Sequence, residues 1–302
     1  MSNNNDSAGG SDSNPRIKDV DAVFSGIPNE STVFTFSKGS VAAPNGGHLQ
    51  GLQAINNGSL YVLSGSSDTE AYLMTVDRPS LMAIEKINIT RNNLPHAGGF
   101  QVIGNYLVVG LEHSKNKGSV VLLYEVNGSS LLFNRKLVTR EGSDTAGAVG
   151  IVKLESGEFL MVVSTWDSEN VDIYKSDKEP LGQASCTFGK IGRWNKESAD
   201  KSRWIDDNWG SYQNLNLVLG SDKNVYMFAF NKSGNNYVDL YSIHLDADNV
   251  EKYFLKRAKK QAACHPRVNF RFGAGIWIRD PNNITLLASE RTLEEYTRIN
   301  LF

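Results

Sequence analysis

The sequence predicts an all-β fold, namely a five-bladed β-propeller whose blades each contain four antiparallel strands. One observation is a series of short β-branched and aromatic runs separated by turn residues. Another is that these runs recur in a fixed order: Gln53 and Gln101 are equivalent points 48 residues apart, and Gly150 follows after another 49. Four strands in a repeat of about 40 to 50 residues are typical of a propeller blade.

Each repeat begins with a short apolar run rich in small residues, which we expect to form the inner strand of a blade. Small residues suit this place because the inner strands crowd around the axis. The fourth and fifth repeats are anchored at Asn216 and Gly275, and an inserted loop over 195–209 lengthens the interval before the fourth. The expected inner strands are 51–55, 99–103, 148–152, 214–218 and 273–278.

Two further runs follow in every repeat. The second run is the most apolar, as expected for a strand buried between neighbouring blades; the third alternates more, which indicates a strand nearer to water. The second runs are 60–65, 106–112, 159–164, 225–230 and 284–290. The third runs are 71–77, 119–126, 170–177, 237–246 and 295–302.

A more polar fourth run completes only four repeats, at 81–89, 131–140, 184–194 and 251–261. The stretch 249–263, which includes the last of these, is also compatible with a helix. The fifth repeat stops after its third run at Phe302. The segment at about 32–38 resembles an outer strand, so we expect it to complete the last blade and to close the ring, which hides two sheet edges.

Composition indicates the domain organisation and the location of the protein. Residues 1–30 begin with a Ser-, Asn- and Gly-rich stretch that predicts a flexible tether, and 31–302 then form a single propeller domain. Such tethers often follow a cleaved signal or lipid anchor, so an extracytoplasmic location is favoured, with a cytosolic protein as the alternative. The net charge is −2, from 31 basic and 33 acidic residues, which argues against nucleic acid as a partner.

The sequence also bears on membrane insertion, oligomeric state and disulfide bonds. No apolar run reaches the roughly 18 residues that a membrane span needs, and we expect a monomer. Cys186 and Cys264 have no metal-ligand spacing. We interpret them as free thiols, with one disulfide as the alternative.

Candidate site residues lie where the repeat loses its symmetry. Five residues before each anchor stand His48, His96, Thr145, Ser211 and Phe270, and the second runs end near Ser66, Glu112, Trp166, Asn231 and Glu290. In a propeller both sets of loops reach one end of the channel. His48, His96, Glu112 and Glu290 could therefore act as acid–base groups, and the two histidines could bind a divalent metal such as zinc, iron or manganese. Hydrogen bonds between blades and solvated salt bridges are the structural alternatives.

Further polar and aromatic residues could contact a ligand at the same end. Trp166 and Trp209 could stack on a sugar or another flat ligand, or could pack between blades. Gln53 and Gln101 could bind a ligand, although satisfying backbone groups of an adjacent blade is the favoured interpretation. Gln213 and Asn231 complete the expected ligand-binding set.

The stretch LQGLQAINNGSLYVLSG resembles the opening blade of plant-type glutaminyl cyclases, which are secreted five-bladed propellers. The resemblance covers one blade and brings no functional residues with it. Because the residues at the channel mouth differ from blade to blade, we favour one asymmetric pocket for a small molecule, glycan or peptide over a multivalent lectin. The alternative is an enzyme, a metal-dependent or acid–base hydrolase, lyase or cyclase.

Overall fold

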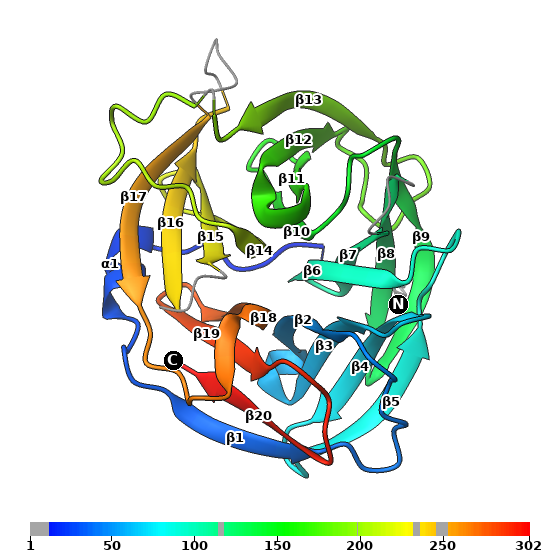
Figure 1. Ribbon diagram of the computed structural model, residues 1–302. Helices are drawn as coiled ribbons and strands as arrows, with labels where there is room; N and C mark the ends of the chain where they lie inside the picture. Colours follow the sequence, from blue (N-terminus) through cyan, green and yellow to red (C-terminus); the bar gives the residue numbers. More distant parts are fainter. Residues whose placement is uncertain (1–11, 114–117, 198, 232–235, 246–252) are drawn as a thin grey trace, which may run out of the picture.

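The computed structural model describes residues 12–113, 118–197, 199–231, 236–245 and 253–302. The chain is all-β, and its antiparallel sheets are arranged as a ring around one axis, as in a β-propeller (Figure 1). The first sheets pair in sequence order, with β2 (His48–Ile55), β3 (Leu60–Ser66), β4 (Ala71–Asp77) and β5 (Met82–Asn88), then β6 (His96–Ile103), β7 (Tyr106–Glu112), β8 (Ser119–Asn127) and β9 (Ser130–Arg140).

The same order continues along the chain. The next strands are β10 (Ala148–Lys153), β11 (Phe159–Ser164), β12 (Asn170–Ser176) and β13 (Phe188–Asn195), followed by β14 (Tyr212–Leu219), β15 (Val225–Asn231), β16 (Tyr237–Ile243) and β17 (Phe254–Gln261). Residues of 249–263 that the sequence left open to a helix therefore form the strand β17. The last strands are β18 (Val268–Asp280), β19 (Asn283–Glu290) and β20 (Tyr296–Leu301).

The two ends of the chain meet along one sheet edge. Strand β1 (Thr32–Ser37) pairs antiparallel with β20, from Thr32 opposite Leu301 to Ser37 opposite Tyr296. Phe36 of β1 is buried, and its neighbours come from the first and last sheets. The strand thus supplies backbone partners and apolar contacts to the edge that β20 would otherwise expose.

The inner strands position the functional side chains because they run parallel around the axis. Ala148 pairs with Gly99, and Ala274 pairs with Gly51. Neighbouring strands approach so closely here that only small residues fit. A Cβ on Gly51 would lie 2.5 Å from the ring of Phe100. We refer to the end at which the inner strands begin as the upper end of the channel, and to the end at which they finish as the lower end.

The sequence predicts a flexible tether over residues 1–30, but residues 12–30 pack against the sheets and include a helix. Residues 1–11 lie outside the part that the structure describes. The chain before α1 (Val20–Gly26) crosses the ring (Figure 1). Ile17, Val20, Phe24 and Ile27 have helical spacing and are buried against the sheets of β14–β15 and β18–β19. Asp19 caps the helix by accepting a hydrogen bond from the Ala22 N–H. This apolar stripe, rather than the polar composition before it, decides the structure of the segment.

The structure also bears on the cysteines and on a membrane span. Both cysteines are free thiols, with Cys186 buried and Cys264 partly exposed, as the favoured interpretation required. Among the described residues, no helix combines the length and the apolar character needed to cross a bilayer.

Candidate functional site

The two histidines singled out by the repeat meet at the upper end of the channel. His48 is the first residue of β2 and His96 is the first residue of β6. Their ring centroids are 5.3 Å apart in an edge-to-face arrangement. Equivalent positions on neighbouring inner strands are thus close enough for both side chains to contact one ligand.

Glu112 pairs with His96 across the β6–β7 ladder. Its Oε1 lies 3.3 Å from His96 Nδ1, and the Glu112 side chain is almost completely buried. The other carboxylate oxygen, Oε2, has no hydrogen-bond partner among the described residues. His96 Nδ1 also has no hydrogen-bond partner among the described residues, so the two groups are close without being hydrogen-bonded. A carboxylate beside an imidazole can take part in acid–base chemistry once the two form a hydrogen bond.

His48 is held in its neutral form. Burial lowers the pKa of its imidazole to about 4, and His96, Arg291 and Arg271 contribute to the decrease. Its Nδ1 lies 3.2 Å from the carbonyl oxygen of Leu49. At neutral pH the His48 ring is therefore an uncharged hydrogen-bonding group.

Aromatic rings enclose the histidines on both sides. The Phe272 ring centroid is 6.0 Å from that of His48, and the Trp166 centroid is 6.2 Å from that of His96. Trp166 follows β11 in the short 3₁₀ turn η2 (Trp166–Ser168), where its side chain is 47% exposed. An exposed indole beside these partly buried rings offers a stacking surface.

Two arginines bring positive charge to the same place. The guanidinium groups of Arg271 and Arg291 each lie 5.8 Å from the Phe272 ring centroid. Neither forms a salt bridge with an acidic residue in the part of the chain that the structure describes. An anionic group at the upper end would find two guanidinium groups close by.

Strand pairing corrects the repeat alignment of the fifth unit. Aligning Gly275 with Gln53 placed Phe270 at the position equivalent to His48. The observed pairing of Ala274 with Gly51 shifts the inner strand of that unit by one residue, and the register of β18 is irregular between Asn269 and Ala274. Arg271 lies in this irregular segment. Phe270, which the repeat spacing placed at the position equivalent to His48, belongs to the buried core.

Amide side chains next to the rings form a hydrogen-bonded network. Gln50 Nε2 donates to Gln213 Oε1 over 2.8 Å, and Gln213 Nε2 donates to Asp167 Oδ1 over 2.7 Å. Asn214 Nδ2 donates to the carbonyls of Gln50 and Phe272. The expectation that Gln213 lies near the site agrees with this geometry, whereas Gln50, Phe272, Arg271 and Arg291 were missed by the sequence analysis.

Glu290 has a different set of contacts from the one expected. It ends β19, as the sequence indicated, but its carboxylate pairs with Arg298 at 2.9 Å and Arg267 at 3.0 Å. It also accepts the backbone N–H of Arg298. The carboxylate is therefore part of a salt-bridge network within its own sheet, which was the structural alternative.

Trp209 and Asn231 have contacts with residues other than the two histidines. The Trp209 indole packs among Trp194, Trp204 and Tyr212 and donates its N–H to the Ser168 carbonyl. These are the contacts of an indole packed between blades, the other of the two interpretations. Asn231 ends β15 opposite Tyr212.

Gln53 and Gln101 connect the inner strands. The Gln53 side-chain oxygen accepts the Val102 N–H, and the Gln101 oxygen accepts the N–H groups of Ile151 and Leu217. Gln101 Nε2 also donates to the Leu217 carbonyl. These bonds agree with the favoured structural interpretation and account for the repeated glutamine.

The geometry does not favour a metal centre at the histidines. Among the described residues, no group of three or more His, Cys, Asp and Glu side chains is arranged to hold a metal ion. Catalytic zinc sites have three protein ligands. His48 and His96 with Glu112 behind one ring do not supply such a set.

Two cavities are relevant to ligand binding. One of about 320 Å³ adjoins His48 and is lined also by Tyr72, Arg291 and Leu293. A larger one of about 490 Å³ lies at the lower end, and none of the upper-end rings contributes to it. The first cavity belongs to the histidine cluster, whereas the second requires a separate explanation.

Comparison with known proteins gives no family. No family model and no curated protein match the sequence. Solved structures with similar backbones include an exo-β-1,3-galactanase from Phanerochaete chrysosporium, with 7% sequence identity and a TM-score of 0.46. The matched region covers 88% of this chain and 64% of the galactanase chain. A GH43 β-1,3-galactosidase has 11% identity and a TM-score of 0.46, covering 89% of this chain and 93% of its own.

A third similar structure is the periplasmic gluconolactonase from Pseudomonas aeruginosa, with 10% identity and a TM-score of 0.40, covering 81% of this chain and 66% of its own. This chain thus spans less than two thirds of the galactanase and gluconolactonase chains. Backbone similarities of this size carry no argument about what the protein binds. The functional interpretation has to depend on the residues at the channel ends.

Proposed function

We propose that this protein is a five-bladed β-propeller, closed by β1 in the last blade, which binds one small anionic organic ligand at the upper end of its channel. The observation that supports the ligand site is the meeting of four rings from four different repeats, namely His48, His96, Trp166 and Phe272. Because the repeats do not all contribute the same side chain, the chain has one asymmetric site rather than five equal ones.

The chemistry of these side chains narrows the ligand class. The exposed Trp166 ring offers a stacking face, and Arg271 and Arg291 lie beside Phe272 without acidic partners among the described residues. Neutral His48 and the Gln50–Gln213 pair provide uncharged hydrogen-bonding groups. We infer a ligand with a ring and a carboxylate, a description that acidic sugars and short peptides both meet.

A calorimetric titration with glucuronate, galacturonate and aromatic dipeptides tests this proposal. We expect at least one of them to bind, and both Trp166→Ala and Arg291→Ala to weaken binding about tenfold. Arg203→Ala removes an exposed arginine from the inserted loop and serves as the matched control. Equal binding by the wild type, Trp166→Ala and Arg291→Ala would contradict the proposed site.

An enzyme is the second candidate, and the His96–Glu112 pair is the observation that favours it. If a hydrogen bond forms between the two side chains, His96 would be a general base oriented by a buried carboxylate. NMR spectra of the bound compound over several hours distinguish the two functions. Turnover that is lost in both His96→Gln and Glu112→Gln supports catalysis, whereas an unchanged compound supports a binding protein.

Location and assembly are part of the same proposal. We propose an extracytoplasmic monomer, as the sequence composition suggested. Light scattering after size-exclusion chromatography tests the monomer, and fractionation of the source cells tests the location. The one-blade resemblance to glutaminyl cyclases stays a prediction of the sequence and contributes no residue to the site.

A further inference from the structure

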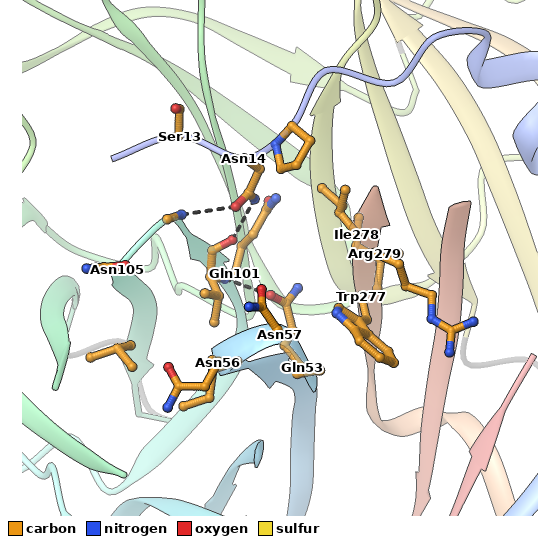
Figure 2. A pocket seen from close by; sticks show the side chains of 17 residues that line it. Ser13, Asn14, Gln53, Asn56, Asn57, Gln101, Asn105, Trp277, Ile278 and Arg279 are labelled. Carbon is orange, nitrogen blue, oxygen red and sulfur yellow. Dashed lines mark hydrogen bonds between the residues drawn. The ribbon is translucent and has the colours of Figure 1, made fainter. Parts of the chain in front are cut away.

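The lower end of the channel contains a cavity that the upper-end site does not explain. It has a volume of about 490 Å³, which is within the range of small-molecule sites. Inner strands β2 and β6 finish at this cavity, and residues 13–15 of the N-terminal segment form part of its wall. Figure 2 shows Asn14, Gln53, Asn57 and Gln101 gathered at its centre, with Trp277, Ile278 and Arg279 to one side.

Amides dominate the polar lining of this cavity. Six of the lining residues carry a side-chain amide, and none of the described lining residues is Asp, Glu or His. The six are Asn14, Gln53, Asn56, Asn57, Gln101 and Asn105. Each amide has a donor and an acceptor group and no charge, which matches hydroxyl groups that also donate and accept. A lining without carboxylates does not suit a cation.

One buried donor in this set has no partner. Gln53 is 2% exposed, and its oxygen accepts the Val102 N–H, but its Nε2 forms no hydrogen bond among the described residues. Leaving a buried amide donor unpaired is costly. Gln101, in contrast, satisfies both ends of its amide with neighbouring strands. Gln53 is therefore the buried lining amide that a ligand oxygen would complete.

The single aromatic ring and the single cation of the cavity are already engaged with each other. The Arg279 guanidinium lies 4.7 Å from the Trp277 ring centroid, and that of Arg78 lies 5.6 Å from it. A Cβ on Gly58 would lie 2.1 Å from the same ring. Trp277 is thus a fixed wall rather than a stacking platform, and one stacked arginine does not form an anion site.

The N-terminal wall is attached by specific bonds. Asn14 Nδ2 donates to the Val102 carbonyl over 2.9 Å, and Asn14 Oδ1 accepts the Gly104 N–H over 3.0 Å. Just beyond it, Ile17 exchanges backbone hydrogen bonds with Leu219 and Ser221. A ligand that touches Asn14 and Gln53 together would contact the segment and the inner strand at once.

We propose that this cavity is a second ligand site, which binds an uncharged polyhydroxylated compound such as a sugar or cyclic polyol, and whose occupation stabilises docking of residues 13–18. The amide lining selects the hydroxyl groups, and the segment supplies one wall. By linkage, a ligand that needs the docked segment also favours the docked segment. The proposal is independent of the anionic site at the upper end.

Saturation-transfer NMR and calorimetry with glucose, galactose, maltose and myo-inositol test the ligand class on the full chain. We expect at least one to bind with a Kd of about 1 mM or tighter. Asn57→Asp and Asn105→Ala should each weaken that binding about five- to tenfold, since each removes an amide donor from the rim. Asp is chosen at position 57 because Asn57 has φ of 55°, which Asn and Asp tolerate.

Asn93→Asp is the matched control, since Asn93 is also exposed with φ of 57° but does not line the cavity. It should bind like the wild type, as should Trp166→Ala at the upper end. No binding of any of the four compounds to the wild type overturns the proposal. An equal loss in Asn93→Asp and Asn57→Asp overturns it as well.

Limited trypsin digestion tests the coupling to the N-terminal segment. Arg16 and Lys18 are exposed cleavage positions on either side of buried Ile17. The compound that binds should slow cleavage at these two positions severalfold at saturation, and this protection should be lost in Asn14→Ala. Unchanged cleavage in the presence of a bound sugar would overturn the coupling.

Discussion

At the scale of single residues, buried amides hold the channel together. Gln101 forms three hydrogen bonds with backbone groups of β10 and β14. Its replacement by an apolar side chain leaves those buried groups without partners, and each such group costs about 1–3 kcal/mol. Gln101 therefore links three sheets, as the favoured interpretation of the sequence required.

Gln101→Leu should lower the free energy of unfolding by about 3–5 kcal/mol. Chemical denaturation followed by circular dichroism measures the change. Gln183→Leu, at an exposed position outside the channel, is the control and should stay within about 0.5 kcal/mol of the wild type. A similarly small effect for Gln101→Leu would show that the inner strands do not depend on this side chain.

His48 should make stability depend on pH. Its pKa is lowered to about 4 from 6.5, first by burial and then by His96, Arg291 and Arg271. The unfolded chain therefore binds a proton more readily between these two pH values. As a result, folding stability is lost as the pH falls from about 6.5 toward 4.

In His48→Gln this contribution should disappear. The difference between wild type and variant should change by about 1–3 kcal/mol over that pH interval, with allowance for the partial exposure of the ring. Unfolding curves at a series of pH values measure it. Parallel pH profiles for the two proteins would show that the imidazole is not shielded as the structure indicates.

At the scale of elements, the repeat identified most strands because strand length and apolar character are local properties. The ends of β3, β7, β15 and β19 fall at Ser66, Glu112, Asn231 and Glu290, as expected. Trp166 lies two residues beyond β11, where η2 follows with Asp167 at φ of 57°. The alternation of apolar and polar residues does not predict this turn.

The site could be predicted only in part because it depends on pairing between strands. His48 and His96 were found because they precede intact copies of the same motif. Arg271 was missed because it lies where the register of β18 is irregular, between Asn269 and Ala274, and an even repeat spacing cannot locate residues there. Arg291 comes from a neighbouring loop, and no repeat spacing brings it to His48.

The contribution of β1 can be measured at its buried aromatic residue. Phe36 is 1% exposed and packs in the same core as Leu287, Ile299 and Met74. Phe36→Ala should lower the free energy of unfolding by about 3–5 kcal/mol. Val33→Ala, on the same strand at 44% exposure, should change it by less than about 1 kcal/mol. Equal effects of the two substitutions would argue against a packed closing strand.

At the scale of the whole molecule, the N-terminal segment contacts sheets that are far apart in sequence. Asn14 bonds to β6, Lys153 of β10 pairs with Asp12, Ile17 bonds beside β14, and Lys18 donates its N–H to the Pro281 carbonyl. The chain then forms α1 and closes against β20 through β1. The segment therefore holds one end of the ring, and its stability cannot be separated from that of the sheets it connects.

Ile17→Ala tests this dependence. The Ile17 side chain is fully buried with Val20 and Phe24 against β14, β15 and β18, so its truncation should cost about 2–4 kcal/mol. Lys18→Ala keeps the neighbouring backbone and serves as the control. Because the segment bridges several sheets, we expect the loss to lower the midpoint of one cooperative transition in calorimetry. A separate transition at lower temperature, with the main one unchanged, would mean that the segment unfolds by itself and does not hold the ring.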